Sequence, residues 1–212
     1  MAEANVPRIV IGLLVLLFSL TVHEMAHAWS ADRLGDPTAR QLGRISFNPL
    51  VHLDLFGSVL LPMMALMVGA PILGWAKPVP VRIDRLRRGR ADFLWVAAAG
   101  PLSNVALALA AALLFRLVAP AAMDAAHVWW MPLMLFLLLS IQVNLILAVF
   151  NMLPIPPLDG GNVLGCLLPE RAAWQFDRLR PYGIFVLFGL LYLGVIHQIL
   201  QPVAILMRLL TP

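Results

Sequence analysis

The segment TVHEMAHAWS, residues 21–30, places two histidines and a glutamate inside a long apolar run. His23 and His27 are four residues apart, so on a helix their imidazole rings project from one face. This spacing lets both rings bind a single Zn²⁺, with Glu24 beside them to take a proton from metal-bound water. The alternative is two histidines packed among helices with satisfied ring nitrogens. Ionisable groups are costly in a bilayer and are usually functional there, which favours the metal site.

A catalytic zinc site usually has three protein ligands and one open position for water, so a third ligand is needed. The candidate is Asp159 in NMLPIPPLDGG, residues 151–161, the only acidic residue between Asp124 and Glu170. The three prolines and two glycines of this segment prevent a continuous helix and favour an irregular backbone that aims the carboxylate. The sequence therefore predicts that Asp159 shares a metal with the histidine pair.

Several other polar residues are weaker candidates. Asn104, Gln142 and Asn144 lie inside apolar segments, where hydrogen bonding between helices explains them at least as well as a functional role. His52 and Asp54 precede a glycine- and proline-rich apolar run and could approach the metal from below. There His52 would assist the oxyanion or support a metal ligand.

The elements that must position these residues are membrane helices. Of the 212 residues, 61% are hydrophobic and only 12% are charged, which is far from the balance of a soluble domain. Five apolar segments (residues 7–30, 57–75, 94–118, 128–150 and 182–200) have about the 20 residues needed to cross the hydrocarbon core. A shorter run covers residues 202–210. We expect one all-α polytopic membrane domain over residues 1–212, with about five membrane segments.

Some other classes of protein are disfavoured by composition. Basic cytoplasmic loops explain the net charge of +4 better than nucleic-acid binding does. A single cysteine, Cys166, excludes an internal disulfide framework and a multi-cysteine zinc site. A cleaved signal peptide is an alternative for the first segment, but its weakly charged start and nearly continuous apolar run favour a retained helix.

The distribution of positive charge predicts the orientation. Basic residues cluster within residues 33–44, 77–90 and 171–180. If residues 57–75 dip into the membrane and return, all three clusters lie on one face, which the positive-inside rule makes cytoplasmic. The glycines and prolines of that segment favour such a re-entrant element over a plain membrane span. The HEMAH motif and Asp159 then reach similar depths near the cytoplasmic side.

The hydrophilic segment of residues 74–90 follows the re-entrant candidate. Val79, Val81 and Ile83 alternate with proline or polar residues, which predicts a short surface strand or hairpin. The basic run after it is typical of a solvated loop that faces lipid headgroups.

These motifs together resemble the site-2 protease family of intramembrane zinc metalloproteases. The resemblance rests on HEMAH and NMLPIPPLDGG, and extends to AAAGPLSN (residues 97–104), GRISFNPLVHLDLFGSVLLP and GWAKPVPV, which are similar to segments of minimal prokaryotic members without sensor domains. It implies that His23, His27 and Asp159 bind one zinc ion, that Glu24 is the general base, and that Asn151 helps to stabilise the transition state. From the residues alone, Asn151 has a second reading, as a cap of the preceding helix end.

The predicted function is therefore zinc-dependent hydrolysis of a peptide bond in or near a membrane-spanning helix of another protein. The expected partners are that substrate and the lipid bilayer, without nucleic acid, in a prokaryotic cell membrane with the active site toward the cytoplasm. A metal-binding membrane transporter is one alternative, because broken helices and polar residues at membrane depth are also transporter features. An inactive zinc-binding scaffold is another, although the intact Glu24 argues against it.

Overall fold

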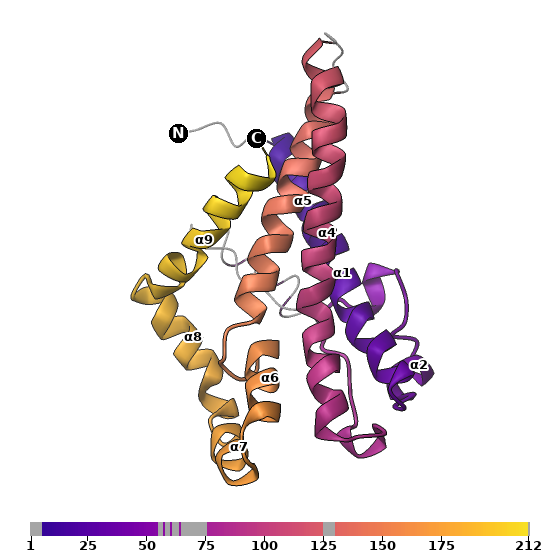
Figure 1. Ribbon diagram of the computed structural model, residues 1–212, viewed down its shortest axis with the longest axis vertical. Helices are drawn as coiled ribbons and strands as arrows, with labels where there is room; N and C mark the ends of the chain where they lie inside the picture. The colour runs from indigo at the N-terminus through magenta and orange to yellow at the C-terminus, as the bar shows by residue number, and fades with distance from the viewer. Residues whose placement is uncertain are drawn as a thin grey trace.

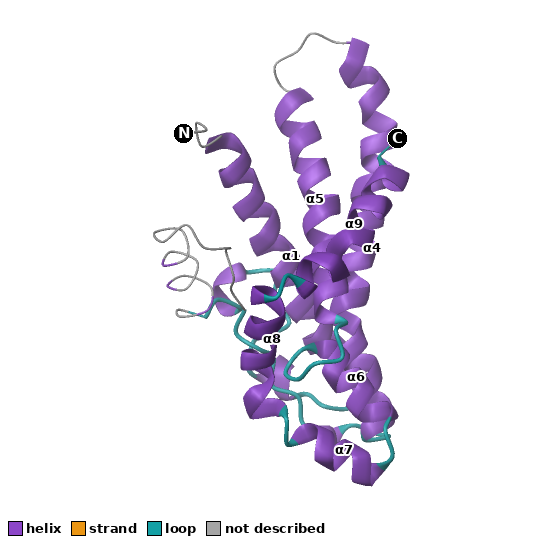
Figure 2. Cartoon of the chain, turned by 90° about the vertical axis from the view of Figure 1, so that its left-hand side faces the viewer, coloured by secondary structure: helices purple, strands orange, loops and turns teal. Residues whose placement is uncertain are grey.

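The computed structural model describes residues 6–54, 57, 60, 64, 76–124 and 130–211. All regular secondary structure in this part of the chain is helical, as Figure 2 shows. This agrees with the predicted all-α class.

Three helices are long and apolar enough to cross a membrane: α1 (Val6–Arg33), α4 (Arg90–Asp124) and α5 (Trp130–Asn151). They correspond to the apolar segments predicted at residues 7–30, 94–118 and 128–150. The three pack against one another, with α1 and α5 running downward in Figure 1 and α4 running upward. The first, third and fourth predicted segments are thus helices of spanning length.

Shorter helices gather at the end of the molecule where α1 and α5 finish and α4 begins (Figure 1). They are α2 (Thr38–Gln41), α6 (Asp159–Leu167) and α7 (Glu170–Asp177), with 3-10 turns η1 (Pro49–Val51), η3 (Ile83–Arg85) and η4 (Arg180–Tyr182). Because α1 ends and α4 begins at the same end, residues 34–89 make no net crossing. The three basic clusters therefore share one end. Most of residues 57–75 lie outside the described residues, so their re-entrant path stays a prediction.

The last apolar stretch differs from the sequence expectation. Helix α8 (Gly183–Tyr192) and helix α9 (Val195–Leu210) break around Gly194, whose φ of +73° favours glycine, while Pro202 lies inside α9. The helices before and after this break are bent by 73°. The described residues hold three candidate spans, or four if the bent pair counts as one, so the predicted five segments are not confirmed.

The predicted surface strand is not confirmed either. Residues 76–82 carry no regular secondary structure, and the described part of the chain contains no strand. Two prolines, Pro78 and Pro80, lack the backbone N–H groups that a strand ladder would use. The segment is instead fixed by single hydrogen bonds to other elements, including a bond of 2.8 Å from the N–H of Lys77 to the carbonyl of His52.

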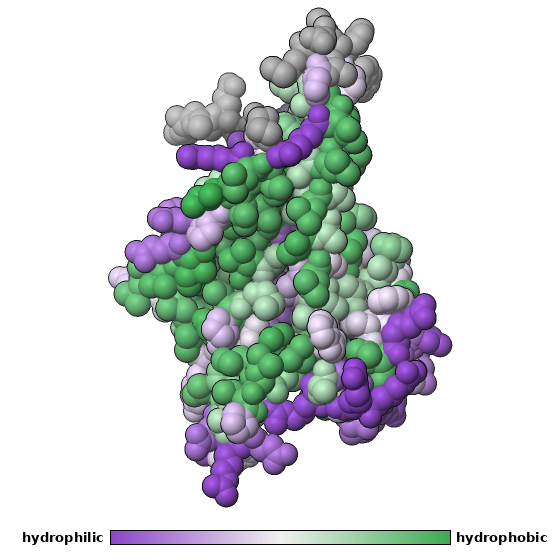
Figure 3. All heavy atoms as spheres, in the orientation of Figure 1, coloured by the Kyte–Doolittle hydropathy of each residue, from purple (hydrophilic) through white to green (hydrophobic). Residues whose placement is uncertain are grey.

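The core is built from small and branched apolar residues where α4, α5 and α9 meet. Ala108, Ala111 and Ala112 of α4 pack with Ile141 of α5 and Val203 of α9. Small residues let membrane helices approach closely, which matters where lipid supplies no hydrophobic drive for association. The outer surface of the long helices is apolar, and the broadest hydrophilic patches lie at the lower end (Figure 3). This distribution suits a chain embedded in a bilayer.

Candidate metal centre

Three metal-ligating side chains meet at the lower end of α1. The Nε2 atoms of His23 and His27 are 3.1 Å apart, and they lie 3.1 and 3.4 Å from Oδ2 of Asp159. Ligand atoms about 2.0–2.2 Å from a zinc ion in tetrahedral geometry lie roughly 3.3–3.6 Å from one another. The three side chains predicted as ligands thus come together at a spacing that fits one tetrahedral ion. His23 and Asp159 are 136 residues apart in the chain.

The irregular segment after α5 brings Asp159 to the histidines. Asp159 is the first residue of α6, and the two glycines behind it pack against the preceding turn. A Cβ atom at Gly160 would collide with the carbonyl of Met152, and one at Gly161 would lie 2.7 Å from the carbonyl carbon of Ile155. Because neither glycine has a side chain, α6 can begin close enough to α5 to aim the carboxylate back at α1.

The outer ring nitrogens of both histidines have hydrogen-bond acceptors. His27 donates from Nδ1 to the carbonyl oxygen of Val96 at 2.7 Å, and His23 donates from Nδ1 to Oδ1 of Asn104 at 2.6 Å. In each neutral ring the Nε2 atom then keeps its lone pair. Two lone pairs that face each other beside a carboxylate form a site for a cation, so the donor set fits zinc.

Gly100 of α4 lies directly against this pair. A Cβ atom at this position would be 2.6 Å from Cε1 and Nε2 of His23 and would also overlap Nε2 of His27. Only glycine leaves room for both rings at this point of α4. Gly100 lies in the AAAGPLSN segment but was not among the predicted site residues; a glycine inside an apolar helix is the signal that could have identified it.

Glu24 is half-buried and faces the extended segment of residues 76–82. Its Oε2 accepts a hydrogen bond of 3.2 Å from the N–H of Val79, the only backbone donor between Pro78 and Pro80. The carboxylate next to the ligand pair therefore lies where an extended backbone passes it.

Asp36 anchors the same extended segment to the end of α1. Its buried carboxylate accepts hydrogen bonds from the N–H of Arg82 at 2.7 Å and from the N–H of Thr38 at 3.0 Å, and also from the Thr38 hydroxyl. Burial acts to raise the pKa of Asp36, but these hydrogen bonds outweigh it and lower the pKa below its ordinary value. The ionised carboxylate is thus a fixed attachment point for residues 76–82.

Three other candidate residues, Asn151, His52 and Asp54, form hydrogen bonds with groups outside the cluster of His23, His27 and Asp159. The side-chain amide of Asn151 donates to the carbonyl of Leu147 at 3.0 Å, which is the interaction expected of a residue that caps the end of α5. His52 is buried and bonds through Nε2 to the carbonyl of Ser46 at 2.9 Å. Its Nδ1 has no hydrogen-bond partner among the described residues. Asp54 accepts from the N–H of Gly57 at 2.7 Å.

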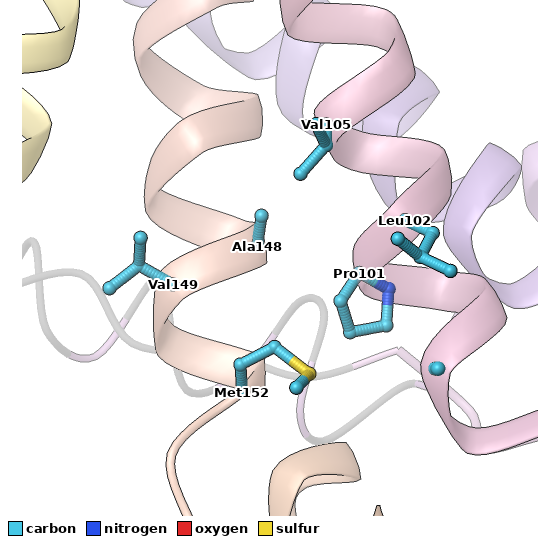
Figure 4. A pocket seen from close by; sticks show the side chains of 7 residues that line it. Pro101, Leu102, Val105, Ala148, Val149 and Met152 are labelled. Carbon is cyan, nitrogen blue, oxygen red and sulfur yellow. The ribbon is translucent and has the colours of Figure 1, made fainter. Parts of the chain in front are cut away.

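An apolar groove of about 300 Å³ lies between α4 and α5 (Figure 4). Two of the residues that line it are chain neighbours of residues discussed above. Pro101 directly follows Gly100, and Met152 directly follows Asn151. The groove is lined by Ala98, Pro101, Leu102, Val105, Ala148, Val149 and Met152. Because no titratable side chain lines it, the groove adds no catalytic group to the site.

Comparison with known proteins supports a protease family. The model of peptidase family M50 matches residues 116–193, which include α5 and Asp159. The "Putative zinc metalloprotease YwhC" of Bacillus subtilis is 37% identical over 92% of this chain and 85% of its own length. The Rip2 protein of Mycolicibacterium smegmatis, which has the same description, is 30% identical over 93% of this chain and 74% of its own length. No solved structure matches the chain significantly. The chain therefore belongs to peptidase family M50, the family of the site-2 proteases.

Proposed function

We propose that the protein is a zinc-dependent intramembrane endopeptidase that hydrolyses a peptide bond in or near a transmembrane helix of a substrate protein. The observation that carries this proposal is the cluster of His23, His27 and Asp159 with Glu24 adjacent, built at one end of a 28-residue apolar helix. The relatives named as zinc metalloproteases support the same chemistry.

The three clustered side chains would hold one zinc ion and leave its fourth position open. When bound, zinc acts as a Lewis acid that lowers the pKa of a coordinated water toward about 7 and polarises the scissile carbonyl. The buried position of the histidines keeps bulk solvent from competing for this site, since their side chains are almost fully covered. Water and substrate would approach from the side of Glu24.

Glu24 would transfer the protons of the reaction. Its carboxylate accepts a proton from the attacking water as the water oxygen bonds to the carbonyl carbon of the scissile peptide. The C–N bond then breaks, and Glu24 returns that proton to the leaving nitrogen, so the products are a free carboxyl group and a free amine. Asn151 would donate its amide N–H to the developing oxyanion, for which its side chain must turn away from Leu147.

The proposed partners follow from where the site lies. The long helices of the chain are covered with apolar side chains, which supports a substrate that lies in the same bilayer (Figure 3). The site would face the cytoplasm of a prokaryotic cell, because the three basic clusters lie at its end of the molecule.

A comparison of three purified proteins tests the proposal: wild type, Glu24→Gln and His23→Ala, each assayed for bound zinc and for cleavage of a reporter transmembrane helix. Glu24→Gln is expected to retain zinc and to lose cleavage, whereas His23→Ala is expected to bind zinc more weakly. Cleavage by Glu24→Gln at the wild-type rate would overturn the mechanism. Zinc binding without cleavage by the wild-type protein would instead indicate a scaffold.

A further inference from the structure

A chain of buried hydrogen bonds runs from His23 through two asparagines to α5. Oδ1 of Asn104 lies 2.6 Å from Nδ1 of His23, and Nδ2 of Asn104 lies 2.8 Å from Oδ1 of Asn144. Nδ2 of Asn144 is in turn 2.8 Å from the carbonyl oxygen of Ser140, and Nδ2 of Asn104 also lies 3.4 Å from the carbonyl of Ser19. The side chains belong to three different helices and are 4%, 0% and 2% exposed for His23, Asn104 and Asn144.

The direction of every hydrogen bond in this chain is set at its far end. The carbonyl of Ser140 can only accept, so Asn144 must present its NH₂ group to it and its oxygen to Asn104. Asn104 must then present its NH₂ group to Asn144 and its own oxygen to His23. An oxygen facing Nδ1 requires that Nδ1 carries the proton. In the neutral ring of His23 the Nε2 atom then has the free lone pair, and this atom faces His27 and Asp159.

We propose that Asn104 and Asn144 are positioning residues that hold His23 in the tautomer and ring orientation needed to bind the metal. The proposal rests on the proposed function in that His23 must be a metal ligand. The two histidines would then be fixed by equivalent means, because each hydrogen-bond path ends on a backbone carbonyl. For His27 the carbonyl is that of Val96, in direct contact, and for His23 it is that of Ser140, reached through the two amides.

Hydrogen bonding between helices alone does not explain this arrangement. Two asparagines that only joined α4 to α5 would need just the Asn104–Asn144 bond, in either orientation of the amides. Here the amide of Asn104 is fully buried and also reaches a ring nitrogen on α1. Residues that hydrogen-bond a metal-bound histidine typically change metal affinity by about 10–100-fold when they are replaced.

The test measures zinc affinity of the full-length protein by competition with a chelator, and the absorption spectrum of the Co²⁺-substituted form. Asn104→Leu is expected to bind zinc about 10–100-fold more weakly. Asn144→Leu is also expected to weaken binding and to alter the Co²⁺ spectrum, although Asn144 has no hydrogen bond to His23.

Two comparisons separate positioning from packing. The double variant Asn104→Leu/Asn144→Leu is expected to bind zinc no more weakly than Asn104→Leu alone, because both residues act through one path. Gln142→Leu, at a half-buried position on the same helix as Asn144, is the matched control and is expected to bind zinc as the wild type does. Wild-type affinity in Asn104→Leu, or losses that add in the double variant, would overturn the proposal.

Folding and function are checked separately. Melting temperatures of the zinc-free proteins show whether each variant folds. If Asn104→Leu does not fold, the zinc affinity of Asn144→Leu decides whether the proposal holds. A wild-type protein that binds no zinc would contradict the proposed function itself. A wild-type protein that binds zinc and cleaves the reporter, alongside variants of unchanged affinity, would contradict only the positioning role.

Discussion

Gly100 matters for the candidate metal centre because it has no side chain. The space where its Cβ atom would lie is occupied by the rings of His23 and His27. Replacing it with alanine forces the rings or α4 to move, and overpacking of this kind typically costs about 1–3 kcal/mol. We expect Gly100→Ala to weaken zinc binding at least about tenfold, because an intact ligand set would be displaced. Chelator competition on the purified protein measures this.

Gly12→Ala provides the matched control for this substitution. Gly12 lies on α1, and a Cβ atom there would meet only Cδ1 of Leu139 at 4.0 Å, an ordinary contact. Zinc binding by Gly12→Ala is expected to equal that of the wild type. If both alanine variants bind zinc equally well, the rings adapt to a Cβ atom at residue 100 and Gly100 has no special part in the site.

At the scale of residues, the sequence predicted the ligand cluster better than its surroundings. The histidine spacing and the lone Asp159 among prolines carry strong local signals, and the structure brings these three side chains together. Asn104 was recognised as a polar residue in an apolar segment, but its partner His23 is 81 residues away. No local pattern encodes such a contact, because it depends on how α1 and α4 pack.

At the scale of elements, α6 is held in place from its far end. Arg90, at the start of α4, donates hydrogen bonds to the carbonyls of Gly165 and Leu168, at and just after the end of α6, with a longer bond of 3.4 Å to Cys166. These carbonyls have few partners within their own helix. The guanidinium group therefore joins the beginning of α4 to the helix whose first residue is Asp159.

Removing this connection is expected to loosen the third ligand. Arg90→Ala should lower the free energy of unfolding by about 1–3 kcal/mol, since hydrogen bonds from a charged donor are lost. It should also weaken zinc binding without removing any ligand. Thermal unfolding and chelator competition measure the two effects. Arg85→Ala, which removes an exposed hydrogen bond to Thr38, is the control and should change stability by no more than about 0.5 kcal/mol.

Helices α8 and α9 show a boundary that the hydropathy of the sequence does not predict. Residues 182–210 are apolar almost throughout, and their hydropathy pattern predicts two runs, residues 182–200 and 202–210, that divide at residue 201. The break occurs instead at Gly194, in the left-handed conformation, while Pro202 is accommodated inside α9. Backbone conformation and packing against α5 decided the outcome. In the same way, Pro78 and Pro80 prevented the strand that alternation had suggested.

At the scale of the whole molecule, all three basic clusters lie at the end that carries the metal-ligand cluster. Lys77 is the only lysine of the chain and is exposed at that end. An impermeant amine reagent is expected to label the peptide containing Lys77 from the cytoplasmic side only. In an Arg116→Lys variant, the new lysine lies in the last third of α4, away from the end where α4 begins, and should react from the other side. Labelling of both lysines from one side would contradict the proposed orientation.

The proposed zinc ligands come from the first and the second half of the chain, and this has a consequence for synthesis. A ribosome delivers His23 and His27 to the membrane more than 130 residues before Asp159. Until α5 has turned back toward the lower end, the histidine pair lacks its carboxylate, and a chain arrested or truncated before that point has no complete hydrolytic centre. The proposed centre thus becomes complete only after α5 and Asp159 have been inserted, so copies that end before this point would not cut the neighbours among which they assemble.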